Sequence, residues 1–324
     1  MDKPQNFAKR IRERYPEGLT GVFAIGGTRT TYILDQNRDK EDPGKIEDFA
    51  AHGEFLLRRY FEFAEMFYTL GGQNMIITAF SFRGFYNRGQ EYAEFVTAEM
   101  ERFMSDYAVA ACKRLKIDPY FTGIDTLLLF PEESPIYQLG RSLQRFQQQW
   151  RYKKGRRKLI WEIASIPLYS FWNSNFAMSL QDQEALAKAV VEHNDELENV
   201  YRVLYQFFSA DVYGTEVPMP HFYLGTNKSG DLKWRSPMPL ALSGGDYLRM
   251  FFTPYPTLFM TPEIMQVILE DLAFNERFFS DQTDYKGKYT RELAQAEYER
   301  VMRLRQDPNA VLGLSRRVEE KTDI

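Results

Sequence analysis

The chain has 324 residues, of which 44% are hydrophobic and 27% charged, so it is long and apolar enough to fold around a sizeable core. A net charge of −4 argues against a general nucleic-acid-binding protein, and a single cysteine, Cys112, excludes an internal disulfide framework and a cysteine-rich metal site. Apolar runs stay well short of the roughly twenty residues that a transmembrane helix needs, and the first residues lack a signal-peptide core, so we expect a cytoplasmic protein without transmembrane segments.

The first half of the chain alternates helical and extended patterns. We expect a short helix over 7–14, a buried strand that ends at the glycines 26–27, and a second extended piece over 30–34. A polar stretch over 35–45 predicts a loop or lid. Helical spacing then predicts helices over 46–70 and 91–115, on either side of an apolar strand over 74–80.

The second half continues in the same way. We expect extended material over 120–130, strands over 159–165, 221–225 and 247–252, and helices over 136–150, 181–208, 262–274 and 289–305. The N-terminal helix lies within 1–17, and a charged tail covers 307–324. Strands that alternate with helices of ten or more residues indicate one α/β domain over 1–324, with a mainly parallel sheet of about six strands and helices on both faces.

Two strand ends carry similar chemistry. The apolar run Gly21-Val22-Phe23-Ala24-Ile25 leads into Gly26-Gly27-Thr28-Arg29-Thr30, and the strand over 74–80 leads into Ser81, two glycines and three basic or amide side chains that include Arg88. Backbone N–H groups, a hydroxyl and a guanidinium are donors that hold a phosphate or diphosphate. Strand ends of a parallel sheet meet at one edge, so we expect one ligand crevice there; the alternative is that the glycines only turn the chain.

A basic run extends from Arg151 to Lys158, with six basic residues in eight positions. It is either a solvated turn or a site for an anionic substrate or for lipid headgroups at a membrane surface.

Few other residues are candidates for a catalytic role. Three histidines, none beside a nucleophile elbow, make a hydrolase triad improbable. We interpret Cys112 as a small buried residue, His193 as a surface residue and His221 as structural, and select His52 as the candidate functional histidine. Aromatic residues amount to 15% of the chain; they fill cores, and they also line pockets for apolar ligands and stabilise carbocations.

Several of these segments together resemble the cis-prenyltransferases, the undecaprenyl diphosphate synthase family. Residues 76–81 followed by Asn87 and Arg88 are similar to the family's "AFSxENWxR" signature, and the Gly26-Gly27 loop stands where the family has its "MDGNGRW" phosphate-binding motif. Lys233-Trp234-Arg235-Ser236 stands where the family has an "RxS" element. The resemblance is greater to the diterpene-synthase branch typified by tuberculosinol synthase and kolavelool synthase, whose "DGTRRW" and "FTVAPSYYMT" resemble residues 26–31 and 252–261.

This resemblance implies a homodimeric enzyme that ionises an allylic C20 prenyl diphosphate, linear or bicyclic, and quenches the cation with water or by deprotonation. It implies that Gly26, Gly27, Thr28, Arg29 and Thr30 hold the diphosphate. Further diphosphate-binding roles fall on Arg58, Ser81, Arg88, Lys233, Arg235 and Ser236. His52 and Tyr92 would lie near the cation, where either can deprotonate it or orient a water.

One departure from the family pattern concerns the metal. The aspartate that holds Mg²⁺ on the diphosphate in the family is Gly26 here, which removes a hard oxygen ligand. Mg²⁺ therefore remains open as a cofactor: another acid, with Asp35 and the acids from Asp39 to Asp42 nearest in sequence, replaces the aspartate, or ionisation relies on arginines. Chain elongation by a cis-prenyltransferase and a noncatalytic prenyltransferase subunit are the alternatives.

A second, shorter resemblance is to the "DIGGTKT" phosphate loop of sugar kinases, which residues 24–30 match apart from the leading acid, here Ala24. The chain lacks a second glycine-rich phosphate segment downstream, so this is the remoter alternative.

Overall fold

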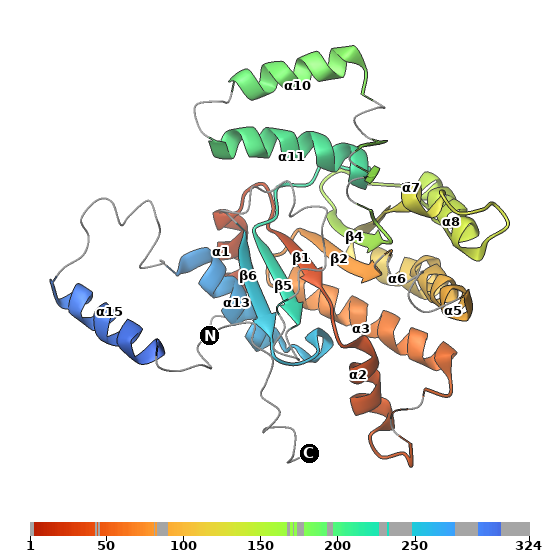
Figure 1. Ribbon diagram of the computed structural model, residues 1–324, viewed down its shortest axis with the longest axis horizontal. Helices are drawn as coiled ribbons and strands as arrows, with labels where there is room; N and C mark the ends of the chain where they lie inside the picture. Colours follow the sequence, from red (N-terminus) through yellow and green to blue (C-terminus); the bar gives the residue numbers. More distant parts are fainter. Residues whose placement is uncertain are drawn as a thin grey trace.

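The computed structural model describes residues 3–42, 44, 46–80, 82, 90–166, 169–170, 172–173, 178–192, 197–226, 232, 248–275 and 291–305. Its centre is a six-stranded sheet made of β1 (Thr20–Ala24), β2 (Asn74–Phe80), β3 (Ile117–Thr122), β4 (Arg157–Ile163), β5 (Phe222–Thr226) and β6 (Arg249–Thr253). The strand order is β3-β4-β2-β1-β5-β6, and every pair is parallel (Figure 1). The predicted single α/β domain with a parallel sheet is confirmed.

Helices lie between the strands in the chain and also precede the first strand and follow the last. They are α1 (Pro4–Arg14), α2 (Thr28–Tyr32), the π-helical turn η1 (Ile33–Asn37), α3 (Phe49–Thr69), α5 (Gln90–Glu101), the 3-10 turn η2 (Arg102–Met104), α6 (Asp106–Leu115), α7 (Ile124–Leu127), α8 (Pro135–Gln149), α10 (Leu180–Glu192), α11 (Leu197–Tyr213), the 3-10 turn η3 (Thr257–Phe259), α13 (Pro262–Phe274) and α15 (Arg291–Leu304). Among these described helices, none combines the length and the apolar character needed to cross a bilayer.

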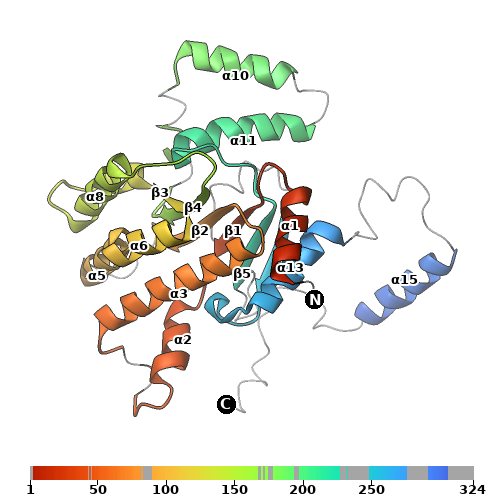
Figure 2. The same ribbon diagram turned by 180° about the vertical axis from the view of Figure 1, so that it is seen from behind.

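The two faces of the sheet are covered differently. Helices α1, α3 and α13 lie over one face, which Figure 2 shows in front of the strands. Helix α11 covers part of the other face through Tyr205 and Tyr213, and α10 packs on the outer side of α11 without burying any residue. Strands β1, β3 and β5 are buried along their whole length, as expected for a parallel sheet covered on both faces.

Aromatic rings build much of the core on the α3 side. Phe23 of β1 contacts Phe63, Phe67 and Phe222 with ring centroids 5.0–5.4 Å apart, in edge-to-face geometry. Each of these rings is almost fully buried. This part of the aromatic content therefore stabilises the fold and does not line an open pocket.

Several predicted elements differ from the structure. Residues 30–34 are helical, because the left-handed turn at Gly27 starts a helix at once and Thr31 donates its backbone N–H to the Gly27 carbonyl at 2.8 Å. The predicted helix over 91–115 is two helices, because Ser105 caps a new one by accepting from the Ala108 N–H. Extended structure over 120–130 ends at Thr122, where left-handed Gly123 opens α7.

The predicted helix over 181–208 also divides, since α10 ends at Glu192 and α11 begins at Leu197. Helical periodicity on both sides gave no sign of the break. Cys112 is buried, as predicted, whereas His193 and the tail over 307–324 lie outside the described residues.

His221 has a structural role, as predicted. Its Nδ1 accepts the Thr20 N–H at 3.1 Å, its ring packs edge-on against Tyr15 at 4.5 Å, and burial lowers its pKa from 6.5 to about 4. The unfolded chain therefore binds more protons than the folded chain between pH 6.5 and 4, and the free energy of unfolding falls as the pH falls through that window.

We expect His221→Gln to flatten this pH dependence by about 2 kcal/mol between pH 7 and pH 5, measured by urea unfolding of both proteins at the two pH values. If the free energy of unfolding fell by the same amount in wild type and variant between pH 7 and pH 5, the role of His221 in this pH dependence would be contradicted.

Candidate functional site

The loop after β1 lies at the point where the strand order of the sheet reverses. β1 pairs with β2 on one side and with β5 on the other, and the chain leaves β1 through residues 25–27 into α2. In open parallel sheets, ligands bind outside the carboxyl ends of the strands at such a reversal. The sheet topology and the sequence therefore indicate the same loop as a ligand site. It consists of residues 26–29, and we call it the GGTR loop.

Gly27 is required at this turn for two reasons. Its φ of +73° lies in the left-handed region, and an added Cβ would lie 3.0 Å from the Cβ of Pro256. A side chain here would be strained in its backbone and crowded by Pro256. The turn brings the first residues of α2 to the carboxyl edge of the sheet.

Two buried threonines anchor Gly26. The Thr257 N–H donates to the Gly26 carbonyl at 3.3 Å, and the Gly26 N–H donates to the Thr257 hydroxyl at 3.5 Å. Thr226, at the end of β5, donates its hydroxyl to the same carbonyl at 3.5 Å and hydrogen-bonds the Thr257 hydroxyl. The Gly26 amide is therefore used by the fold, and a ligand at this loop has to be held mainly by the residues that follow it.

Sequence reasoning missed both threonines. The signal that could have found Thr226 is a hydroxyl side chain at the end of a strand that neighbours β1.

Arg29 lies on the exposed side of α2. It donates one guanidinium N–H to the Gly44 carbonyl at 2.7 Å, which draws part of the polar segment 35–45 toward the GGTR loop. A guanidinium carries five N–H donors, so this contact leaves others for an anion.

His52 is the buried neighbour of this arginine. It lies on α3 with 8% of its surface exposed, and its ring packs edge-on against Tyr32 of α2, with centroids 4.9 Å apart. Burial and the positive charge of Arg29 lower the pKa of His52, so the imidazole is neutral at pH 7. In the described part of the chain neither ring nitrogen has a hydrogen-bond partner, which makes His52 a buried histidine with unused polar atoms beside the loop.

Arg58 and Arg59 are adjacent in sequence and face different places. Arg59 donates to the Leu258 carbonyl at 2.6 Å and to Glu62 at 2.8 Å, so it ties α3 to η3, which anchors the GGTR loop. Arg58 lines a separate cavity of about 220 Å³ with Glu54, Arg102 and Tyr107. Of the two arginines, Arg59 is therefore the one that contacts a segment bound to the GGTR loop. Which of two adjacent residues faces the loop depends on how α3 is rotated about its axis.

The remaining predicted positions are not described. Ser81, Arg88, Lys233, Arg235 and Ser236 lie outside the described residues, and so does the side chain of Tyr92, whose backbone belongs to α5. Of the predicted set, the described structure brings together the residues 26–30 and His52.

The donor set at the GGTR loop does not fit Mg²⁺. Gly26 offers no side-chain oxygen. Asp35, the first acid proposed as a replacement, is exposed on η1 and accepts from Gln36 at 2.8 Å. The acids from Asp39 to Asp42 are also exposed, and Asp39 pairs with Arg38 at 3.4 Å. In the described part of the chain, no three His, Cys, Asp or Glu side chains gather at one place. Mg²⁺ in proteins is held by carboxylates together with substrate phosphates, and this loop does not supply the carboxylates.

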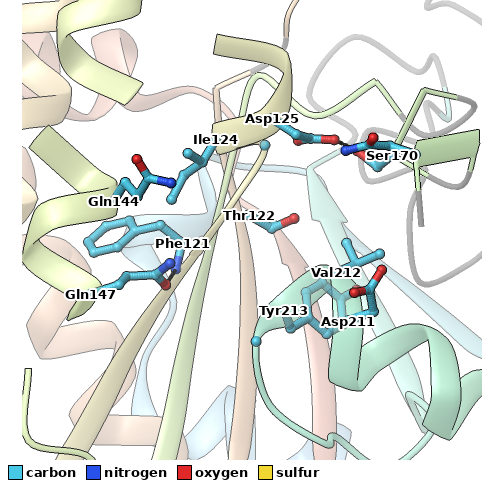
Figure 3. Close-up of a pocket in the computed structure, with 13 residues that line it drawn as sticks. Phe121, Thr122, Ile124, Asp125, Gln144, Gln147, Ser170, Asp211, Val212 and Tyr213 are labelled. Carbon is cyan, nitrogen blue, oxygen red and sulfur yellow. Dashed lines mark hydrogen bonds between the residues drawn. The ribbon is translucent and has the colours of Figure 1, made fainter. Parts of the chain in front are cut away.

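A second cavity lies at the same edge of the sheet, beyond β3. It has a volume of about 310 Å³ and is lined by Asp125, Ser170, Asp211 and Thr122, whose hydroxyl is buried (Figure 3). Asp125 accepts from the Ser170 hydroxyl at 2.8 Å, and burial with the charge of Asp211 raises the pKa of Asp125. Two carboxylates, with no basic side chain among the described lining residues, do not suit a diphosphate.

Comparisons with known proteins bear on the fold. No family model matches the chain, and no curated protein matches its sequence. Among solved structures, the chain is similar to lavandulyl diphosphate synthase from Lavandula x intermedia in complex with dimethylallyl diphosphate, with a TM-score of 0.50, 13% identity, and coverage of 80% of this chain and 96% of that one. The chain has the fold of that prenyl diphosphate synthase.

A probable undecaprenyl diphosphate synthase from Campylobacter jejuni also matches, with a TM-score of 0.48, 15% identity, and coverage of 81% and 98%. The similarity to lavandulyl diphosphate synthase is one of fold alone, and membership of the cis-prenyltransferases and of their diterpene-synthase branch stays a prediction.

Proposed function

We propose that this protein binds an allylic C20 prenyl diphosphate at the GGTR loop and ionises it as a terpene synthase. The observation that carries the proposal is that Arg29 follows a loop at the reversal of strand order, and that the buried His52 packs against the same short helix, α2, through Tyr32. The fold, shared with a lavandulyl diphosphate synthase, supports the choice of a prenyl diphosphate over other phosphate compounds.

The chemistry asked of these residues is mainly electrostatic. In the reaction, the C1–O bond breaks and diphosphate leaves with the electron pair, so negative charge develops on the leaving group. Arg29 and the backbone N–H groups of the first turn of α2 would stabilise that charge. The allylic cation then takes up a water that loses a proton, or it loses a proton itself, and His52 can accept that proton because it is neutral.

The apolar tail of the substrate would lie along aromatic rings of α2, α3 and α5. Tyr32 packs against Phe55 at 5.4 Å, and Phe49, which is half-exposed, packs against Phe95 of α5 at 4.7 Å. Exposed aromatic surface of this kind suits the apolar tail of an amphiphilic substrate.

Two other functions of the same fold compete with this one. Chain elongation uses the same diphosphate chemistry, and a noncatalytic prenyltransferase subunit is favoured by the glycine at position 26. The fold shared with a lavandulyl diphosphate synthase favours both over the sugar-kinase alternative. We also propose a homodimer, which light scattering of the purified protein would test.

One assay separates these functions. The purified protein is incubated with labelled geranylgeranyl diphosphate and with a bicyclic C20 diphosphate, each with and without Mg²⁺, and the products are separated. Free diphosphate with a C20 alcohol or hydrocarbon supports the synthase, and longer prenyl diphosphates support elongation. Binding without turnover supports the noncatalytic subunit.

His52 leads to a prediction about pH. If neutral His52 accepts the proton, kcat/KM of the wild type falls as the pH falls through a pKa below 6.5, the ordinary value of histidine. His52→Gln should lower kcat/KM about a hundredfold and remove this acid limb. His221→Gln is the matched control and should keep the limb. An unchanged limb in His52→Gln would contradict the assignment.

A further inference from the structure

A cavity of about 510 Å³ lies at the opposite, amino-terminal edge of the sheet, beside the starts of β3 and β4. Its apolar lining comes from Val109 of α6, Phe146 of α8 and Trp150, and the rings of Phe146 and Trp150 stack with centroids 5.6 Å apart. The GGTR loop lies at the carboxyl-terminal edge of the sheet, so a ligand in this cavity does not block that loop.

Basic side chains form the rest of the lining. Lys113, Arg151, Lys153 and Arg156 line the cavity, and no acidic side chain does so among the described residues. Arg156 pairs with Asp118 at 3.6 Å, whereas no carboxylate lies within 4 Å of Lys113, Arg151 or Lys153 in the part of the chain that the structure describes. Three cations without partners make this cavity strongly positive in a chain whose net charge is −4.

The basic segment is fixed by the residues between its cations. Asp118, which is 1% exposed, accepts the Trp150 Nε1–H at 3.0 Å and the Lys153 N–H at 2.8 Å. Tyr152 stacks on Tyr120 at 4.6 Å and donates its hydroxyl to the Pro119 carbonyl at 3.2 Å. The segment is therefore held in place, with Arg151 and Lys153 exposed, and a ligand would meet cations whose positions need little reordering.

We propose that this cavity docks the protein on a membrane surface that carries anionic phospholipids. The phosphate of a headgroup would contact Lys113, Arg151 and Lys153, and the upper part of an acyl chain would contact Phe146 and Trp150. Charge complementarity favours an anion, and the stacked rings in the same cavity favour an anion that carries an apolar chain. This inference is independent of the proposed function.

The test is vesicle co-sedimentation at 100 mM NaCl with two compositions, phosphatidylcholine alone and a 3:1 mixture of phosphatidylcholine and phosphatidylglycerol. Arg151→Gln/Lys153→Gln removes two cations of the cavity, and Lys9→Gln/Lys188→Gln removes two exposed lysines elsewhere. Urea unfolding of the variants checks that each is folded. Binding of the full chain to inorganic phosphate is measured separately by calorimetry.

We expect the wild type and the control variant to bind the mixed vesicles and not the neutral ones. The cavity variant should bind the mixed vesicles about thirtyfold more weakly, the equivalent of about 1 kcal/mol for each basic side chain. Equal binding by the two variants, or the absence of wild-type binding, would overturn the proposal. Binding of inorganic phosphate that the cavity variant loses, without any vesicle binding, would also overturn it and identify a site for a soluble phosphate.

Discussion

Replacing Arg29 by alanine should lower kcat/KM for the prenyl diphosphate about a thousandfold while the protein stays folded. The guanidinium is the cation of the GGTR loop, and the removal of one donor aimed at developing negative charge costs about 10²–10³ in rate. The fold should tolerate the change, because Arg29 is exposed and its hydrogen bond to the Gly44 carbonyl is at the surface. Steady-state release of diphosphate measures the effect.

The matched control is Arg38→Ala. Arg38 is an exposed arginine nearby in sequence, whose side chain contacts only the neighbouring Asp39 among the interactions described. It should change kcat/KM less than threefold. Arg29→Lys should recover part of the activity, since lysine restores the charge without the planar fork of donors. A rate for Arg29→Ala equal to that of the wild type would remove this residue from the site.

The second large effect concerns stability. Gly123 ends β3 with a φ of +92°, and an added Cβ would lie 1.8 Å from the Ile163 carbonyl oxygen of β4. Gly123→Ala must therefore adopt a strained left-handed backbone and also push two strand ends apart. We expect the free energy of unfolding to fall by about 4 kcal/mol, the sum of left-handed strain and overpacking.

Gly155→Ala separates these two costs. Gly155 has a similar φ of +79°, but no atom lies within 4 Å of the added Cβ, so only the backbone strain applies. This variant should lose about 1 kcal/mol. Urea unfolding of both variants gives the difference between their free energies of unfolding. If the two variants lost the same free energy, Gly123 would not be in close contact with the Ile163 carbonyl.

Local sequence patterns were sufficient for the architecture. Apolar runs between helices of ten or more residues indicated a parallel sheet, because strands joined by helical crossovers run in one direction. The helix over Pro262–Phe274 was predicted with its observed bounds, since Thr261 caps one end and the apolar spacing is unbroken. Patterns failed where a single turn decided the outcome, as at Gly27, which converts β-branched residues into the start of α2.

The candidate site was only partly predictable. The sequence alone determined that a glycine turn with a hydroxyl and an arginine follows a buried strand, and that a dense basic run precedes β4. The tertiary structure decided that Thr226 and Thr257 anchor Gly26 and that Arg59 contacts the segment behind the loop. It also decided that Asp118 holds the basic run in place. Those contacts join residues far apart in the chain, in most cases on different elements, so they depend on how helices and strands pack together, which local periodicity does not encode.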